Sequence, residues 1–165
     1  MNNIIAMKKL LLSFAAAAVL ALGAQEAKAQ TPYRTALGLG IDLGDGETLF
    51  GPQIKHSFGG ANAGNAQVLF GDNHIVIGAD YSYNRPFAGT NGLGWYVGVG
   101  PQLSFIDFGD EDRTYFAIRP AAGLEYKIPN TPLAAHFDWK PWWNLSNNSD
   151  FEPSRFSLGF KFVLK

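Results

Sequence analysis

His136 and Asp138 stand two residues apart in a segment whose alternating pattern places both side chains on one face of a β-strand. A histidine oriented by a carboxylate is the base of a hydrolytic triad, which also needs a serine within hydrogen-bond reach. Serines occur on the same kind of polar strand face, at Ser57, Ser82, Ser104 and Ser157. No local motif joins any of them to the histidine, so we predict that the protein is not an enzyme and has no catalytic residues.

A larger group of ionisable side chains alternates with apolar residues along the chain. Its members are Lys55, Asp80, Arg119, Glu125, His136, Asp138, Lys140 and Lys161. If this polar face turns toward an enclosed interior, the charges must pair, because an isolated buried charge is very costly. We therefore predict a polar network inside the fold, with a structural role.

Metal and cofactor chemistry find little support in the sequence. The chain has no cysteine, which excludes disulfides, thiolate metal sites and a cysteine nucleophile. The acidic stretch 107–113, "DFGDEDR", lacks the spacing of an EF-hand, so we expect its charges to be solvated. The glycines of 38–46, "GLGIDLGDG", lack the dinucleotide-binding spacing, and no helical pattern follows them. We expect no cofactor and no bound metal.

The first 29 residues have the pattern of an export signal. Lys8 and Lys9 precede the apolar run "LLLSFAAAAVLALGA", and Ala27 and Ala29 put small residues where a signal peptidase reads them. The apolar run is short for a membrane-spanning helix, which needs about 20 residues. We predict a cleaved signal peptide at 1–29 and a single domain at 30–165.

The predicted mature chain is mildly acidic and poor in charge. Only 16% of the 165 residues are charged, against about 25% in an average soluble domain, while 14% are aromatic. Beyond the signal peptide the formal net charge is −3, which argues against a nucleic-acid partner.

No helical period occurs after the signal peptide. Apolar and polar residues instead alternate with a period of two in eight segments separated by turn residues, which predicts an all-β fold. The segments are 34–43, 48–58, 65–71, 74–84, 93–105, 114–126, 133–145 and 154–165. The third is the shortest and the least regular.

Alternation gives each strand two faces but does not say which one is inside. A soluble lipocalin-like barrel would enclose the apolar face around a ligand, whereas a membrane barrel would turn that face toward lipid. Glycines such as Gly98 and Gly100 gather on the polar face, where they would relieve crowding inside a narrow cylinder. Aromatic residues near segment ends fit the interfacial girdles of a membrane barrel. The girdle candidates are Tyr81, Tyr83, Trp95, Tyr126, Trp139 and Trp143.

Several segments also have the 9 to 11 residues with which a tilted strand crosses a bilayer. In hydrocarbon an unpaired backbone group costs several kcal/mol, so such a sheet must close on itself. We predict a closed, antiparallel, up-and-down transmembrane barrel of eight strands.

The signal peptide, the eight alternating segments and the aromatic-rich last segment "RFSLGFKFVLK" resemble the small bacterial outer-membrane β-barrel proteins of the OmpA/OmpX-like class. The resemblance implies periplasmic termini and outer loops at 44–47, 72–73, 107–113 and 146–153, with a periplasmic turn at 127–132. It also implies insertion by the barrel-assembly machinery, which reads the last strand. Members commonly end that strand with an aromatic residue, whereas this chain ends Phe162-Val163-Leu164-Lys165.

These patterns together predict a non-enzymatic integral protein of the bacterial outer membrane, exported through the periplasm and in contact with outer-membrane lipid. Its role would be structural, adhesive or in surface interaction within the cell envelope. Two alternatives remain open: a secreted soluble barrel that binds an apolar ligand, and an outer-membrane barrel enzyme that modifies lipid.

Overall fold

A computed structural model describes residues 31–44, 46–107, 109, 112–146 and 149–164. The predicted signal peptide at 1–29 lies outside the described residues. The described chain forms strands without helices, in the order β1 (Thr35–Gly44), β2 (Glu47–Gly59), β3 (Asn62–Phe70), β4 (His74–Pro86), β5 (Leu93–Asp107), β6 (Asp112–Lys127), β7 (Leu133–Trp139), β8 (Trp142–Asn144), β9 (Asp150–Glu152) and β10 (Phe156–Val163). None of the segments described from residue 31 onward is a helix long and apolar enough to cross a membrane.

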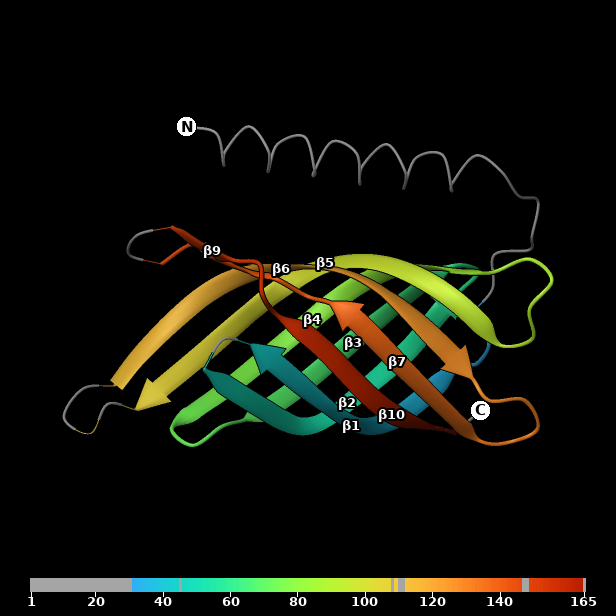
Figure 1. The fold of residues 1–165 in the computed structure, drawn as a ribbon, viewed down its shortest axis with the longest axis horizontal. Coiled ribbons are helices and arrows are strands. Elements are labelled where there is room, and N and C mark those ends of the chain that lie inside the picture. The colour runs from blue at the N-terminus through green and yellow to red at the C-terminus, as the bar shows by residue number, and fades with distance from the viewer. Residues whose placement is uncertain (1–30, 45, 108, 110–111, 147–148, 165) are drawn as a thin grey trace.

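The strands close into an antiparallel eight-stranded barrel, in which β7 and β8 together form one strand of the wall and β9 and β10 together form another (Figure 1). We call each of these eight wall strands a stave. Each of β1 to β6 pairs with its neighbour in sequence, β6 pairs with β7, β7 with β10, and β10 with β1. Pairing of β1 with β10 closes the cylinder, so every stave has a neighbour on both sides. The predicted all-β fold and the closed eight-stranded barrel are confirmed.

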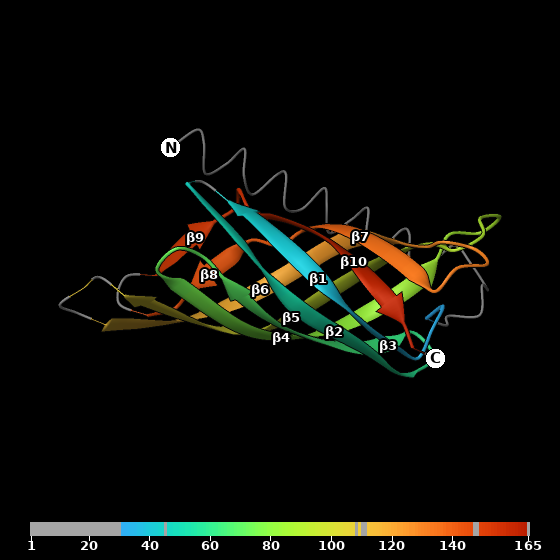
Figure 2. The same ribbon diagram turned by 90° about the horizontal axis from the view of Figure 1, so that it is seen from below.

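The barrel has two different ends. We call the end with the β1–β2, β3–β4, β5–β6 and β8–β9 connections the loop end, where the long β5–β6 hairpin projects beyond the other staves (Figure 1). The opposite end, which we call the terminal end, holds the β2–β3, β4–β5 and β6–β7 connections and both described chain ends (Figure 1). There the Thr31 amide donates to the Gly60 carbonyl, and the Leu164 amide donates to the Thr35 carbonyl. Seen from below, the staves are tilted against the long axis of the barrel (Figure 2).

Three differences from the sequence prediction are larger than the shifts of one or two residues seen at other strand ends. β3 begins at Asn62 because the glycine-rich turn after β2 is tight, with positive φ at Gly59 and Gly60. The predicted seventh strand is interrupted between β7 and β8, and the predicted loop 146–153 contains the short strand β9. Sequence patterns locate residues typical of turns, but they do not show which of these residues take part in the hydrogen bonding between strands.

The interruption between β7 and β8 has a simple cause. Trp139 pairs with Ala122 and Trp143 with Ile118, so β7 and β8 keep one register along β6. This register sets Pro141 opposite Pro120. Because neither proline has an N–H group, no ladder hydrogen bond forms between them. The ladder is interrupted only here, and pairing with β6 resumes in β8.

The polar and apolar faces fall as the alternation predicts. Leu39 and Phe160 are directly paired on neighbouring strands and are 67% and 64% exposed on the outer surface, whereas Asp42 is 1% exposed inside. A methyl group added at Gly100 would lie 1.9 Å from the Ala79 carbonyl oxygen of β4. The glycine side of β5 is therefore the crowded one, and the apolar side is the outside of the barrel.

Candidate functional site

The barrel lumen holds the ionisable residues that the sequence singles out. All eight are buried in the structure: Lys55, Asp80, Arg119, Glu125, His136, Asp138, Lys140 and Lys161. Asp42 and Arg155 join them, so that the described interior contains five basic and four acidic side chains besides His136. The alternation places Asp42 and Arg155 on the inward face, but sequence reasoning missed them as members of the network.

Near the terminal end, one carboxylate is shared by two lysines. Lys55 Nζ donates to Glu125 Oε1 at 2.8 Å, and Lys161 Nζ donates to Glu125 Oε2 at 2.7 Å. Lys55 also donates to Asn84 Oδ1 at 2.7 Å, and its ammonium lies 5.2 Å from the centroid of the Tyr96 ring. Both oxygens of the carboxylate are thus used by charge-assisted hydrogen bonds, which are the stronger kind.

Toward the loop end, one carboxylate is shared by two arginines. Asp42 Oδ1 accepts from Arg155 Nε at 3.0 Å and from Arg155 Nη2 at 2.7 Å, while Asp42 Oδ2 accepts from Arg119 Nη2. The Arg155 guanidinium lies over the ring of Trp142, 3.6 Å from the centroid. Trp142 is an inward residue that the sequence analysis did not select, although it shares the parity of Lys140 and Asn144.

Two further polar pairs lie between the two clusters. Lys140 Nζ donates to Asp80, and the Tyr96 hydroxyl donates to Asp138 Oδ2. His136 Nδ1 has no hydrogen-bond partner among the described residues. The carboxylate of Asp138 therefore holds Tyr96 rather than the imidazole, so the orienting contact of a triad is not formed.

The candidate serines are also engaged elsewhere. Ser57 accepts from Thr31 at 2.5 Å, Ser82 accepts from Asn65 and Asn84 at 3.1 Å, and Ser104 accepts from Gln102 at 3.2 Å. Ser157 lies opposite Asp138 in the ladder between β10 and β7. The geometry around His136 supports no nucleophile with an activated base.

The centre of the lumen has little free space. A cavity of about 20 Å³ lies among polar side chains that include Asp80, His136, Asp138 and Lys140. This volume is close to that of a single water-sized probe. A charged and filled interior of this kind does not suit an apolar ligand, which removes the main structural support for a lipocalin-like interior site.

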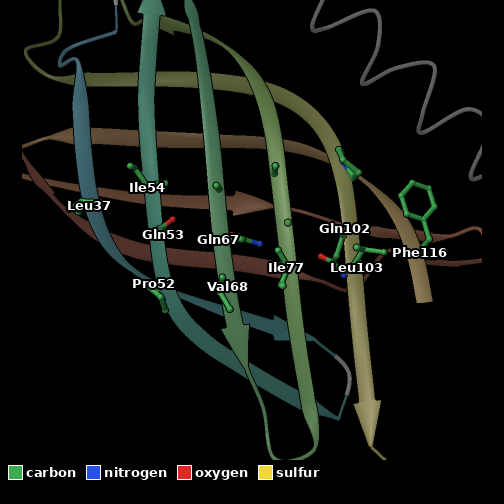
Figure 3. A pocket seen from close by; sticks show the side chains of 14 residues that line it. Leu37, Pro52, Gln53, Ile54, Gln67, Val68, Ile77, Gln102, Leu103 and Phe116 are labelled. Atoms are coloured by element: carbon green, nitrogen blue, oxygen red, sulfur yellow. The ribbon is translucent and has the colours of Figure 1, made fainter. Parts of the chain in front are cut away.

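A larger hollow lies instead on the outer wall of the described barrel. A shallow groove of about 580 Å³ crosses the outer face of β2, β3, β4 and β5 (Figure 3). Its lining includes two small residues, Ala66 and Ala79, which are direct partners in the β3–β4 ladder. Larger apolar side chains, including Ile54, Ile77 and Leu103, also line it. The outward side chains of the groove are apolar, in contrast to those of the lumen.

The six aromatic girdle candidates lie on the outer face in two groups. Tyr81, Tyr83, Trp95 and Tyr126 are toward the terminal end, whereas Trp139 and Trp143 are toward the loop end. Tyr83 contacts Trp95, with ring centroids 6.4 Å apart. The Trp139 indole donates to the Pro153 carbonyl, and the Trp143 indole donates to Ser149. Their role at a lipid interface stays a prediction.

No cluster of three or more histidine, aspartate or glutamate side chains suited to a metal ion occurs among the described residues. In the acidic stretch 107–113, residues 108, 110 and 111 lie outside the described part. The backbone amide of Gly109 donates to Asp107 Oδ1 at 2.7 Å, as in an ordinary loop.

Comparison with known proteins identifies the fold. No protein-family model matches the sequence, and no curated protein matches it. Among solved structures, the chain is similar to the N-terminal β-barrel domain of OprF from Pseudomonas aeruginosa, with a TM-score of 0.64. The match covers 78% of this chain and 95% of that domain at 16% sequence identity. The protein thus has the closed eight-stranded fold of an OmpA-like outer-membrane β-barrel domain.

Proposed function

We propose that the chain is a non-enzymatic integral protein of the bacterial outer membrane, with a structural, adhesive or surface-interaction role in the cell envelope. The observation that carries the proposal is the inverted distribution of side chains. Charged residues such as Arg119 and Lys55 are at most 2% exposed inside the barrel, while Leu39, Phe50 and Phe160 are more than 60% exposed outside. In water this arrangement would expose a large apolar surface, whereas in a bilayer the same surface contacts the hydrocarbon chains of the lipid.

The lumen supports a structural rather than a conducting or catalytic role. Glu125 and Asp42 each hold two cations on different staves, which ties the wall together across the interior. In this proposal residues 1–29 direct export, the barrel-assembly machinery inserts residues 30–165, and outer-membrane lipid covers the lateral surface. The loop end then faces the outside of the cell, as the OmpA-like resemblance implies.

Cell fractionation followed by gel electrophoresis tests this proposal. We expect the protein in the outer-membrane fraction, extractable only with detergent, and migrating differently before and after boiling because the closed barrel resists dodecyl sulfate. Recovery in the aqueous supernatant without detergent would contradict the proposal and favour a soluble barrel. A change in lipid A composition on replacing His136 by alanine would instead favour the lipid-modifying enzyme.

A further inference from the structure

The charges outside the lumen are segregated between the two ends of the barrel. Every acidic residue that the structure describes outside the lumen lies at the loop end: Glu47, Asp72, Asp107, Asp112, Asp150 and Glu152. Three of the four described basic residues outside the lumen lie at the terminal end, at Arg34, Arg85 and Lys127, and Arg113 is the exception. Among the described residues, the outer surface of the terminal end is therefore basic and carries no carboxylate.

Arg85 lies where the apolar outer wall ends on β4. It follows Tyr81 and Tyr83 on the outer face of this strand and pairs with Trp95 on β5. Its Nε donates to the Tyr83 hydroxyl at 2.8 Å, and its Cζ lies 5.5 Å from the centroid of the Tyr83 ring. The Tyr83 ring also contacts Trp95. These contacts orient the guanidinium in advance, which lowers the entropy that it loses when it binds an anion.

A small pocket lies beside Arg85, between β4 and β5 at the terminal end. We call it the rim pocket, and its volume is about 100 Å³. Arg85 and Trp95 line it together with Gly92 and Gly94, which have no side chains to fill it. Since a water molecule takes about 30 Å³ in the liquid, the rim pocket has room for a group of the size of a phosphate. It is too small for a whole drug-sized ligand.

The lumen cluster behind the rim pocket adds positive charge. Glu125 is part of the lining, but its two carboxylate oxygens accept from Lys55 and Lys161. Two ammonium groups around one carboxylate leave this cluster with a net charge of +1. The carboxylate in the lining therefore does not make the site negative.

Lys127 brings a further positive charge to the same end. Its backbone amide donates to the Gly92 carbonyl at 2.8 Å, which ties it to the loop that lines the rim pocket. Its Nζ donates to the carbonyls of Ile128 and Thr131. These acceptors are neutral, so they hold the ammonium group without cancelling its charge. Positive charge around a concave site raises the local concentration of anions.

We propose that the rim pocket binds the phosphate of an anionic phospholipid from the leaflet that surrounds the terminal end. The Arg85 guanidinium is the main ligand, because its fork of donors matches a phosphate group, and Lys127 adds attraction. Tyr83 and Trp95 offer ring surfaces to the glycerol and the first carbons of the acyl chains. A zwitterionic headgroup binds less well, since the described outer surface of this end has no carboxylate for its ammonium group. This site rests on the membrane location proposed above.

Nuclear magnetic resonance of the ¹⁵N-labelled protein in octyl glucoside micelles, which contain no phosphate, tests the site. The readout is the Trp95 indole cross-peak, assigned by its loss in Trp95→Phe. The indole peaks of Trp139 and Trp143, at the loop end, are internal controls for general lipid contact. We expect dihexanoyl phosphatidylglycerol to shift the Trp95 peak saturably, at concentrations that leave the two control peaks nearly unchanged.

Two further probes separate the parts of the ligand. Dihexanoyl phosphatidylcholine has the same phosphodiester with an added cation, and we expect it to bind about fivefold more weakly or worse, the cost of about one ion pair. Inorganic phosphate has no glycerol or acyl part for the aromatic rings, and we expect no shift of the Trp95 peak at the same concentrations.

Protein variants supply the second arm of the test. Arg85→Gln is expected to weaken phosphatidylglycerol binding about tenfold, the loss expected for hydrogen bonds to a charged group. Arg85→Lys, which keeps the charge but not the planar fork, is expected to lie between Arg85→Gln and the parent. Arg113→Gln removes the same charge at the loop end and is the matched control. The dispersion of the remaining cross-peaks reports that each variant is folded.

Several results would overturn the site. These are no saturable shift of the Trp95 peak, equal shifts of the Trp139 and Trp143 peaks, equal affinity for phosphatidylcholine, or equal weakening by Arg113→Gln. Saturation by inorganic phosphate at the same concentrations would replace the lipid site by a site for free phosphate. A protein found in the outer-membrane fraction that gives one of these results loses only this site, whereas recovery in the aqueous supernatant contradicts the proposed function itself.

Discussion

Replacing Glu125 by glutamine is expected to lower the free energy of unfolding by about 3–5 kcal/mol, the usual cost of breaking a buried ion pair by removing one partner. The change keeps the size of the side chain and removes only its charge. The ammonium groups of Lys55 and Lys161, now 2.8 Å and 2.7 Å from its oxygens, would be left in the interior without a counter-ion. Urea titration of the protein refolded into lipid vesicles measures the effect as a shift of the unfolding midpoint.

A variant that removes the whole cluster is the control for this prediction. In Lys55→Met/Glu125→Leu/Lys161→Met no charge is left unpaired, and apolar replacement of a buried ion cluster is often neutral or stabilising. We expect this triple variant to recover most of the stability lost by Glu125→Gln. A loss below about 1 kcal/mol for Glu125→Gln, as for exposed ion pairs, would show that the lumen is wet and the network weak.

Leu39→Arg is expected to destabilise the membrane-inserted barrel by about 2–4 kcal/mol, as found for a basic residue on the lipid face near the bilayer midplane. Leu39 lies in the middle of the ten-residue strand β1 and is 67% exposed on the outer wall. The same vesicle titration measures the change. Asp72→Arg, in the turn between β3 and β4, is the matched control and should have little effect because it meets water. Equal stability of Leu39→Arg and the parent protein would mean that β1 does not face hydrocarbon.

The sequence predicted the faces of the strands well because each position depends on local alternation. Leu39 and Asp42 could be assigned to opposite faces from parity alone, and glycine at positions such as Gly100 showed which face is crowded. The closed barrel followed because lipid does not tolerate unpaired strand edges. These inferences need only neighbouring residues and the nature of the solvent.

The pairing inside the lumen was beyond such reasoning. Glu125 and Lys55 are hydrogen-bonded although they are 70 residues apart in the sequence, and Arg155 and Asp42 are 113 residues apart. Which side chains become partners therefore depends on the register between all strands of the barrel. The break in the seventh stave likewise depends on two prolines that are distant in sequence and opposite in register. Trp142 had the parity of an inward residue, but its guanidinium partner comes from another stave.

The contact between His74 and Glu47 was also missed. His74 stands at the first position of β4, where alternation gives way to a turn, so the pattern alone gave no sign that its Nδ1 lies 2.8 Å from the carboxylate of Glu47 on β2.

Accessibility of single spin labels tests most directly whether the apolar wall meets lipid. Because the chain contains no cysteine, Leu39→Cys, Phe160→Cys and Asp72→Cys each provide one labelling site. In lipid vesicles we predict that labels at Leu39 and Phe160 collide with apolar oxygen and are shielded from a water-soluble nickel complex, while the label at Asp72 shows the reverse. Access of the nickel complex to Leu39 and Phe160 equal to its access to Asp72 would contradict the account.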